Sequence, residues 1–340
     1  MSGTTIRSRA PLRISFAGGG TDVSPYCDER GGAVLNACID RYAYATVTPG
    51  GSSYVVSSLD YNCTIDCALD DPFIYDGQLD LAKTTVDWFR GRYDIPAGFE
   101  VLLHNDAPPG SGLGSSSAIT VALISAITGL LRVPLDEYET AELAYRVERD
   151  EAGIRGGRQD HYAATFGGVN FMEFRDGSVV VNPLRVKAET LYELQYSLAV
   201  AYVGGSHVSD HIIDRQTENY TAGNASAIAA MDELKMLAHR MKNSLLVGRI
   251  VEFGELLNEA WQAKKLMADG ITTSRIDDLY DAARAAGALG GKLPGAGGGG
   301  YMFFVCKSGR RFAVQESLRE MGATLDSFSF VTEGVRTWFV

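Results

Sequence analysis

The sequence has no long hydrophobic run. None of its uninterrupted apolar segments approaches the roughly 20 residues that a membrane-spanning helix requires. The opening stretch, MSGTTIRSRAPLRIS, also lacks the apolar core of a secretory signal peptide. We therefore expect a cytoplasmic protein without a membrane partner.

Cysteine is scarce and does not occur in a pairing pattern. The five cysteines are an odd number and are scattered along the chain: Cys27, Cys38, Cys63, Cys67 and Cys306. Cys63 and Cys67 lack the second pair that a four-cysteine zinc site would need. This argues against a disulfide framework and predicts reduced thiols, as is typical of cytosolic proteins.

Positive charge is in deficit. The chain has 31 Lys and Arg residues against 42 Asp and Glu residues, which gives a net charge of −11. This balance argues against nucleic acid or an anionic membrane surface as the main partner. A phosphorylated ligand would then need cations gathered locally, or a metal ion. With 340 residues, 46% of them hydrophobic, the chain is long enough for one large or two ordinary globular domains.

The most informative stretch is PPGSGLGSSSA, residues 108–118. It follows a strand-like run, Phe99 to His104, and precedes an apolar segment, Ala118 to Leu131, that predicts a buried helix. Its glycines allow close backbone approach, and its serines lie where helix N-caps are favoured. The free N–H groups of a first helical turn bind anions, so a phosphate is the natural guest. The alternative is an ordinary strand-to-helix turn.

Two other phosphate loops are excluded. No Walker sequence, Gly-x4-Gly-Lys-[Ser/Thr], occurs, and the segment after the expected helix looks helical again, where a dinucleotide fold would need a strand. Residues 295–300 do match Gly-x-Gly-x-x-Gly, but a strand, Tyr301 to Cys306, follows them. That dense glycine run, led by Lys292, implies close packing against a ligand or another backbone.

Two further loops carry candidate acids. APLRISFAGGGTD, residues 10–22, predicts a strand that ends in three glycines before Asp22, which could approach a polar ligand but more often bonds its own backbone in a turn. An amphipathic helix over 135–151 brings Glu148 to the start of a second glycine loop, GIRGGRQD, residues 153–160. Its Asp160 could be functional or could cap a short helix over 161–165.

The remaining elements follow from hydrophobic periodicity and turn residues. Residues 33–66 predict an antiparallel meander, residues 81–93 a helix, and residues 169–181 a hairpin around Asp176-Gly177. The weakly patterned stretch 185–194 is the expected domain boundary. Beyond it we expect a strand over 196–203, helices over 208–216, 222–243, 249–267, 274–286 and 312–321, and strands near 324–331 and 335–340.

Three segments together resemble one superfamily, the galactokinase, homoserine kinase, mevalonate kinase and phosphomevalonate kinase (GHMP) kinases. APLRISFAGGGTD resembles its first motif, PPGSGLGSSSA its nucleotide loop, and GGKLPGAGGGG its C-terminal glycine motif. In the first motif the usual Gly-Glu-His is replaced by three glycines, while Asp22 is kept. That departure is similar to the branch that phosphorylates D-glycero-D-manno-heptose 7-phosphate on the anomeric oxygen, a step toward nucleotide-activated heptose for bacterial surface polysaccharide.

The resemblance implies an α+β, two-domain GHMP kinase fold. Residues 1–190 would form the ribosomal protein S5 domain 2-like N-terminal domain, and residues 191–340 the ferredoxin-like C-terminal domain, with the active site between them. It implies ATP and Mg²⁺ as cofactors and a small-molecule sugar phosphate as substrate, with a homodimer possible. Two rivals stay open: a family relative acting on a sugar such as fucose or galactose, and a non-catalytic sugar sensor.

The resemblance also assigns residues. ATP would be bound by Pro109, Gly110, Ser111, Gly112, Leu113, Gly114, Ser115, Ser116 and Ser117. Ser116 and Glu148 would hold magnesium, for which one hydroxyl, one carboxylate and the nucleotide phosphates are a sufficient set. Asp160 would be the catalytic base, kept ionised by Arg13.

The sugar would be bound by residues from three loops: Gly19, Gly20, Thr21, Asp22, Gly156, Gly157, Arg158 and Gly297. The substrate's own phosphate needs a cation. The sequence offers Arg155, Arg158, Lys264 and Lys265 for that role, with nothing to separate them. For each of the four, a solvated surface position is an equally good interpretation.

Overall fold

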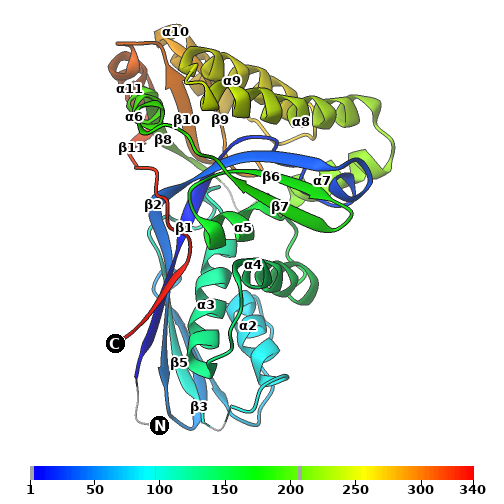
Figure 1. The fold of residues 1–340 in the computed structure, drawn as a ribbon, viewed down its shortest axis with the longest axis vertical. Helices are drawn as coiled ribbons and strands as arrows, with labels where there is room; N and C mark the ends of the chain where they lie inside the picture. Colours follow the sequence, from blue (N-terminus) through cyan, green and yellow to red (C-terminus); the bar gives the residue numbers. More distant parts are fainter. Residues whose placement is uncertain (1–3, 96, 206–208) are drawn as a thin grey trace.

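The computed structural model describes residues 4–95, 97–205 and 209–340. They form two β-sheets, each with helices packed against it, stacked along the long axis of the molecule (Figure 1). The α+β class expected from the sequence is confirmed. No helix in this described part of the chain is long and apolar enough to cross a membrane.

The larger sheet belongs mainly to the N-terminal half. Its central path runs β12-β1-β2-β5-β3-β4, with bounds β1 Ile6–Ala17, β2 Gly32–Pro49, β3 Ser53–Ser58, β4 Cys63–Ala68, β5 Phe99–Asn105 and β12 Arg336–Phe339. The expected meander is wrong in one respect: β5 lies between β2 and β3 and runs parallel to β3. Pairing between β2 and β5 places the nucleotide-loop strand in the middle of the sheet.

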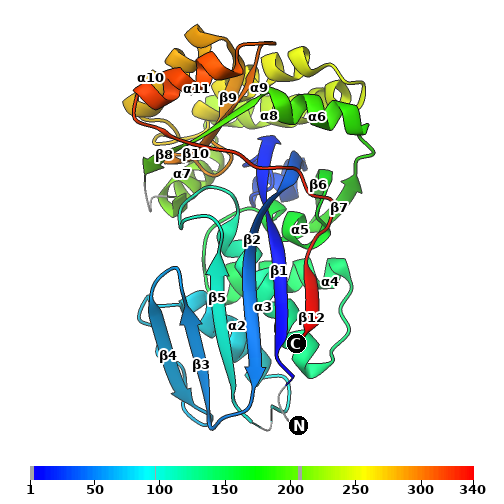
Figure 2. The same cartoon turned by 90° about the vertical axis from the view of Figure 1, so that its left-hand side faces the viewer.

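The long strand β2 serves two sets of partners. Its second half pairs with β5, and its first half pairs with β6 (Val169–Arg175), which forms the expected hairpin with β7 (Ser178–Pro183). Strand β2 therefore runs from the N-terminal sheet toward the second sheet, as Figure 2 shows.

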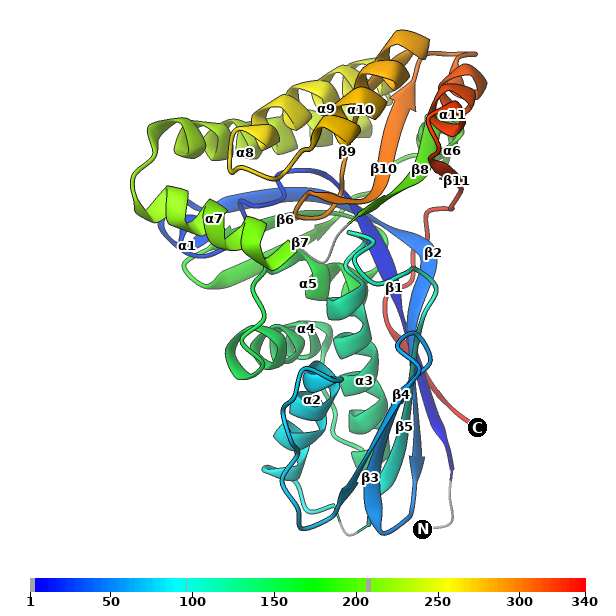
Figure 3. The same ribbon diagram turned by 180° about the vertical axis from the view of Figure 1, so that it is seen from behind.

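Helices cover one face of this sheet (Figure 3). They are α2 (Asp80–Arg90), α3 (Ser115–Leu131), α4 (Glu137–Arg146) and α5 (Gln159–Phe166). Helix α3 contacts β1, β2 and β5 and buries Val121, Ile124 and Ile127 completely, as its apolar sequence predicts. Helix α4 begins with a capping box of Asp136 and Glu139 and passes into a π-helical turn at Val147–Glu151, which carries Glu148.

The second sheet has the order β11-β8-β10-β9. Its strands are β8 (Leu198–Gly205), β9 (Ala288–Lys292), β10 (Gly299–Cys306) and β11 (Thr324–Asp326), and the helices around it are α6 (Ala188–Ser197), α8 (Ala225–Leu246), α9 (Ile250–Lys265), α10 (Ser274–Ala286) and α11 (Arg311–Glu320). The strand β9 was not foreseen, because Gly290 and Gly291 obscure its pattern. The weakly patterned stretch 185–194 was not expected to be helical, but most of it belongs to the helix α6.

Two short helices lie at the junction of the sheets: α1 (Tyr26–Arg30), which was not expected, and α7 (Ser209–Thr221). The start expected for the latter, residue 208, lies outside the described residues. The last strand, β12, pairs with β1, so the C-terminus returns to the N-terminal sheet (Figure 2). A division of the chain at about residue 190 stays a prediction.

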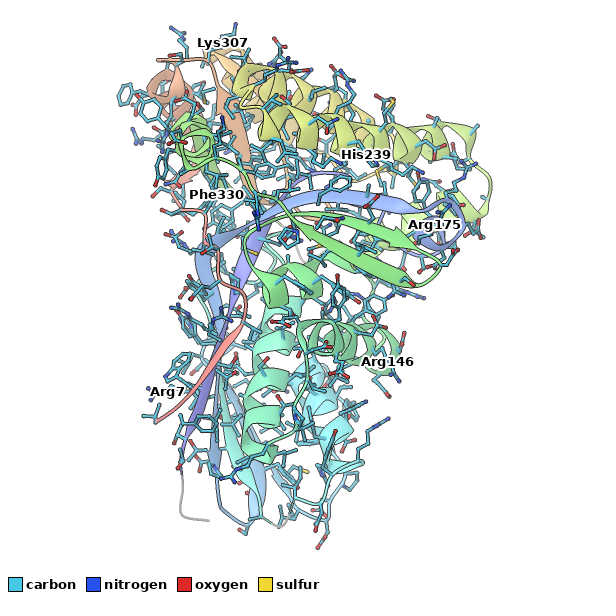
Figure 4. The ribbon with its side chains drawn as sticks, in the orientation of Figure 1. Arg7, Arg146, Arg175, His239, Lys307 and Phe330 are labelled. Carbon is cyan, nitrogen blue, oxygen red and sulfur yellow. The ribbon has the colours of Figure 1, made fainter. Side chains whose placement is uncertain are left out.

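Aromatic packing joins the two sheets. Phe16, near the end of β1, makes edge contacts with Phe253 of α9 at 5.1 Å and Phe303 of β10 at 5.7 Å between ring centroids. Phe330, labelled in Figure 4, lies 6.3 Å from the same ring. Full burial of one such side chain stabilises the fold by about 2 kcal/mol, so this contact fixes how the two halves meet.

Candidate active site

A cavity of about 730 Å³ is lined by loops from both halves of the chain. The glycines after β1, the serine–glycine loop before α3 and the loop before α5 contribute from the N-terminal half. Helix α7, Lys264 of α9 and the loop Pro294–Ala296 contribute from the C-terminal half. This volume lies within the usual range for small-molecule sites. The three motifs found in the sequence therefore converge on one cavity.

The serine–glycine loop is held from two sides. The backbone N–H of Arg13 in β1 donates to the carbonyl of Leu113 at 3.0 Å, and the N–H of Tyr301 in β10 donates to the carbonyl of Ser111 at 3.0 Å. The buried members Ser111, Leu113 and Ser117 anchor the loop. The members that line the cavity are Pro109, Gly110, Gly112, Gly114, Ser115 and Ser116.

The C-terminal glycine motif packs against this loop. A Cβ atom on Gly295 would lie 2.7 Å from Cα of Gly112, closer than such atoms approach in proteins. The match to Gly-x-Gly-x-x-Gly is followed by the strand β10, as expected from the sequence. Glycine is needed here because the backbone of the C-terminal motif touches the backbone of the serine–glycine loop at Gly295 and Gly112.

The first turn of α3 opens onto the cavity without a side-chain cap. The N-cap is Gly114, in the left-handed conformation with φ of 78°, and no serine takes the capping role expected from the sequence. The N–H groups of this turn therefore have no capping side chain, and the helix dipole adds partial positive charge. These are the properties of an anion site.

Arg13 and Asp160 form a two-pronged ion pair beside that turn. Nε and Nη2 of Arg13 each donate to one carboxylate oxygen of Asp160 at 2.7 Å, and Nη1 donates to the carbonyl of Gly112 at 2.7 Å. A Cβ atom on Gly114 would lie 3.2 Å from the Asp160 carboxyl group, so the pair adjoins the start of α3. The alternative in which Asp160 caps a helix is wrong, because the N-cap of α5 is Arg158.

Glu148 lies fully buried behind the serines. Its Oε2 accepts a hydrogen bond from Ser117 at 2.8 Å and lies 2.5 Å from Nε2 of His161, while its Oε1 lies 3.2 Å from Nη1 of Arg149. Burial alone would raise the pKa of Glu148, but Arg149, His161 and Ser117 outweigh it and lower the pKa, so the group is ionised.

Sequence reasoning missed His161 and Arg149, and it named Ser117 only as a member of the ATP-binding loop, not as a partner of Glu148. Each directly follows a residue that the resemblance assigned, namely Ser116, Asp160 and Glu148. Successive residues of a helix point about 100° apart, so when one faces the cavity its neighbour can face the interior. Ser116 and Asp160 line the cavity while Ser117 and His161 are buried, whereas Arg149 lines the cavity and Glu148 is buried. The sequence shows that two serines are adjacent, but only the packing of the folded chain shows which of them is buried.

The residues present suit a magnesium ion. Ser116 is exposed on the cavity wall, and the ionised Glu148 has one buried oxygen, Oε1, without a hydrogen bond among the described residues. In the same part of the chain, no group of three or more His, Cys, Asp or Glu residues could hold a metal by itself. A hydroxyl and a carboxylate are sufficient donors only where water and phosphate oxygens complete the set, which is the usual situation for magnesium.

The sequence allowed two positions for Asp22, bonded to its own backbone in a turn or facing a ligand cavity, and the structure shows both. It is buried, it accepts from the N–H of Gly20 at 3.0 Å as in a turn, and it also accepts from the N–H of Gln159 at 3.1 Å while lining the cavity. Burial raises the pKa of Asp22, partly offset by these backbone donors. A Cβ atom on Gly157 would lie 2.0 Å from its carboxylate, so Asp22 ties the first glycine loop to the loop before α5.

Some of the other residues expected to contact the sugar line the cavity, and others do not. Gly19, Gly20, Gly156 and Gly157 line the cavity. Thr21 is buried, and its hydroxyl donates to the carbonyl of Ala33 at 3.2 Å and accepts from the same residue's N–H at 3.1 Å. Thr21 is not part of the lining, and neither are Arg158, which lies over the Tyr145 ring, and Gly297, which lies against Ile271. Their roles in binding stay predictions.

Two buried lysines lie near the Arg13–Asp160 pair. Lys264 lines the cavity and donates to the carbonyls of Leu293 and Gly295. Its burial lowers its pKa to about 7. Lys292 has no hydrogen-bond partner for Nζ among the described residues, and burial, together with Lys264, lowers its pKa as well. Neither lysine is a surface cation, so the surface interpretation that the sequence left open for Lys264 is wrong.

Comparison with known proteins places this geometry in a family. Residues 80–168 match the GHMP kinases N terminal domain, and residues 239–324 match the GHMP kinases C terminal domain. The chain is 36% identical over 337 residues to D-glycero-alpha-D-manno-heptose 7-phosphate kinase from Campylobacter jejuni, covering 98% of this chain and 99% of that one. The chain belongs to the GHMP kinase family.

Further relatives agree on the class of enzyme. The crystal structure of a D-glycero-D-manno-heptose 1-phosphate kinase from Bacteroides thetaiotaomicron superposes with a TM-score of 0.83 at 35% identity, covering 98% of this chain and 99% of that one. An L-fucokinase/L-fucose-1-P guanylyltransferase from Bacteroides fragilis is 27% identical over 329 residues, which are 89% of this chain and 34% of that protein. The chain is a sugar kinase, and ATP is the phosphate donor of its family.

Proposed function

We propose that this GHMP kinase transfers the γ-phosphate of ATP to the anomeric hydroxyl of D-glycero-D-manno-heptose 7-phosphate, giving the 1,7-bisphosphate for nucleotide-heptose and surface polysaccharide synthesis. The observation that carries the proposal is the Arg13–Asp160 pair, which adjoins the uncapped start of α3 in the shared cavity. A base and an anion site are thereby side by side. The heptose kinase of Campylobacter jejuni, similar over its full length, supports this choice of sugar.

In this mechanism the phosphates of ATP lie along the N–H groups of Gly110 to Ser117, with the terminal phosphate at the start of α3. The sugar hydroxyl attacks the γ-phosphorus, the bond to the β-phosphate oxygen breaks, and ADP leaves. The hydroxyl proton passes to Asp160, whose carboxylate keeps lone pairs free while it accepts from Arg13. Phosphoryl transfer needs mainly alignment and charge neutralisation, which the loop and Arg13 supply.

A magnesium ion held by Ser116 and Glu148 would neutralise further phosphate charge when bound. The buried cluster of Ser117, His161 and Arg149 then fixes the Glu148 carboxylate in one orientation. This arrangement favours an enzyme over a non-catalytic sensor. A protein that only bound sugar would have no need of an ionised carboxylate buried beside the phosphate loop.

A second candidate is a kinase for an unphosphorylated sugar such as fucose or galactose. The similarity to the fucokinase part of the Bacteroides fragilis enzyme supports it. The two heptose relatives also differ in their names, one acting on a 7-phosphate and the other on a 1-phosphate. Both substrates would give the same bisphosphate, so only substrate use distinguishes them.

The deciding experiment is a panel of acceptors. ATP consumption is measured with the 7-phosphate and the 1-phosphate of D-glycero-D-manno-heptose, the free heptose, L-fucose and D-galactose, and the product is identified by phosphorus NMR. We expect the 7-phosphate to give the highest kcat/KM, and Asp160→Asn to abolish most turnover with it. A higher kcat/KM for fucose or for the 1-phosphate would replace the proposed substrate, and no turnover with any acceptor would support the sensor.

A further inference from the structure

If the proposed substrate is correct, the site must hold a second phosphate away from the reacting hydroxyl. Four cationic side chains line the cavity: Arg13, Arg149, Arg155 and Lys264. The N–H groups at the start of α3 are assigned to ATP in the proposed function, and the protein has a negative net charge, so a second phosphate ester is best held by one of these cations. The hydrogen bonds that each of the four already makes separate them.

Arg13 and Arg149 are occupied. All three nitrogens of the Arg13 guanidinium donate to Asp160 or Gly112. Arg149 donates to the carbonyls of Ile154 at 3.2 Å and Gly157 at 3.4 Å and lies beside Glu148, so it holds the loop before α5 in place. Arg149 keeps one donor without a partner among the described residues, its buried Nε, while both of its Nη atoms are used by the loop.

Lys264 is buried and donates to two backbone carbonyls. The two remaining candidates from the sequence are not part of the lining. Arg158 lies 4.1 Å over the Tyr145 ring and pairs with Glu142 at 3.4 Å, and Lys265 pairs with Asp277 at 3.3 Å. Neither is placed to meet a substrate inside the cavity.

Arg155 differs from all of these. Its side chain is 71% exposed, and among the described residues its one ion-pair partner is Asp214 of α7, with Nε 3.3 Å from Oδ1. Its neighbours Gly156 and Gly157 line the cavity, as do Ile213 and Gln216 on either side of Asp214 in α7. The pair therefore spans the edge of the cavity between the loop before α5 and α7, five residues along the chain from Asp160.

We propose that Arg155 binds the phosphate ester that the sugar already carries, and that this phosphate replaces Asp214 as the partner of the guanidinium. An exposed ion pair adds little to the stability of a protein, so it is easily exchanged. A phosphate dianion matches the two-pronged guanidinium better and carries more charge than one carboxylate. Asp214 repels an incoming phosphate until Arg155 turns to it, and it keeps Arg155 paired when an unphosphorylated sugar is present.

The test compares Arg155→Gln with a matched control. Arg249 forms an ion pair with Glu252 whose two side chains are 71% and 45% exposed, as are those of Arg155 and Asp214, but it does not line the cavity. We expect Arg155→Gln to raise KM for the sugar phosphate roughly 10- to 100-fold, the loss of one charge-assisted phosphate contact, with kcat and KM for ATP within about threefold of the parent. Arg249→Gln should change neither constant.

Two further measurements make the assignment specific. Inorganic phosphate should inhibit the parent enzyme competitively against the sugar phosphate, and this inhibition should weaken in Arg155→Gln. Asp214→Asn should lower KM for the sugar phosphate about two- to fivefold, because it removes one surface charge that competes for Arg155. An unchanged KM for the sugar phosphate in both Arg155→Gln and Asp214→Asn would overturn the role of Arg155. If phosphate inhibition were lost only in a third variant, Lys264→Met, the phosphate subsite would instead lie at Lys264.

The outcomes separate this inference from the proposed function. If the parent enzyme prefers an unphosphorylated sugar, the proposed substrate is wrong and a phosphate subsite has no ligand. If the parent prefers the sugar phosphate while Arg155→Gln keeps its KM, the function stands and only the assignment of Arg155 fails.

Discussion

Ser117 donates a hydrogen bond of 2.8 Å to the buried carboxylate of Glu148, while the preceding residue, Ser116, faces the cavity. The two adjacent hydroxyls therefore have different surroundings: Ser117 is buried in the protein interior and Ser116 lies at the cavity wall. The Glu148 carboxylate also lies 2.5 Å from His161, which directly follows Asp160 in α5. The carboxylates of Glu148 and Asp160 are thus connected through the short helix α5.

The first prediction separates the two serines. Ser116→Ala should raise the magnesium concentration needed for half-maximal activity, because it removes a ligand oxygen, and should leave the unfolding midpoint in urea unchanged. Ser117→Ala should instead lower the free energy of unfolding by about 1 kcal/mol or more, because a buried carboxylate loses a donor. A normal magnesium titration for Ser116→Ala would place the ion elsewhere.

The second prediction concerns the base. Asp160→Asn keeps an oxygen that can accept from Arg13 but cannot take the proton of the sugar hydroxyl. We expect kcat to fall about 10²- to 10⁴-fold, the usual contribution of a positioned base, while ATP binds as in the parent. Steady-state kinetics and calorimetric titration with ATP measure the two effects, and unchanged turnover would refute the role.

The third prediction uses the contact between two loops. A Cβ atom on Gly295 would meet Cα of Gly112 at 2.7 Å, so Gly295→Ala should displace the phosphate loop and raise KM for ATP. Gly91→Ala is a suitable control, because its φ is −72° and the added atom would make ordinary contacts at 3.6 Å. Equal ATP kinetics in the two variants would show that the glycine motif does not support the loop.

The fourth prediction concerns pH. Burial lowers the pKa of Lys264 to about 7 and also lowers that of Lys292, so above pH 7 the unfolded chain binds protons that the folded protein does not. Stability should then rise as pH increases from about 7 to 8, because it rises wherever the unfolded state holds more protons. Above about pH 8 the buried thiols of Cys27, Cys38 and Cys306 oppose this rise, because burial raises their pKa.

Urea unfolding at pH 7, 7.5 and 8 measures this slope. Lys292→Met should flatten it and should stabilise the protein at pH 7, because a buried amine without a hydrogen bond is replaced by an apolar chain of similar length. Lys307→Met, at an exposed position just after β10 (Figure 4), is the control and should keep the slope. A parent protein whose stability falls over this pH range would contradict the assignment.

Much of the fold could be predicted from the sequence because its determinants are local. Alternating apolar residues located β1 and β5, and the apolar run after the serines located α3. Turn residues located the β6–β7 hairpin at Asp176-Gly177. The three glycine-containing motifs were also visible in the sequence, and the resemblance that they carry named Arg13 and Asp160, which the structure shows as a pair.

The order of the strands and the long-range contacts of the site could be known only from the tertiary structure. The insertion of β5 between β2 and β3, the return of β12 to β1 and the partner of Glu148 all depend on contacts between residues distant in the chain. Sequence offered four equal cations for a second phosphate, and only the folded protein shows that Arg155 is exposed at the cavity while Lys264 is buried. Local patterns determine which elements form and which chemistry is available, whereas long-range packing determines which of several equivalent side chains faces the ligand.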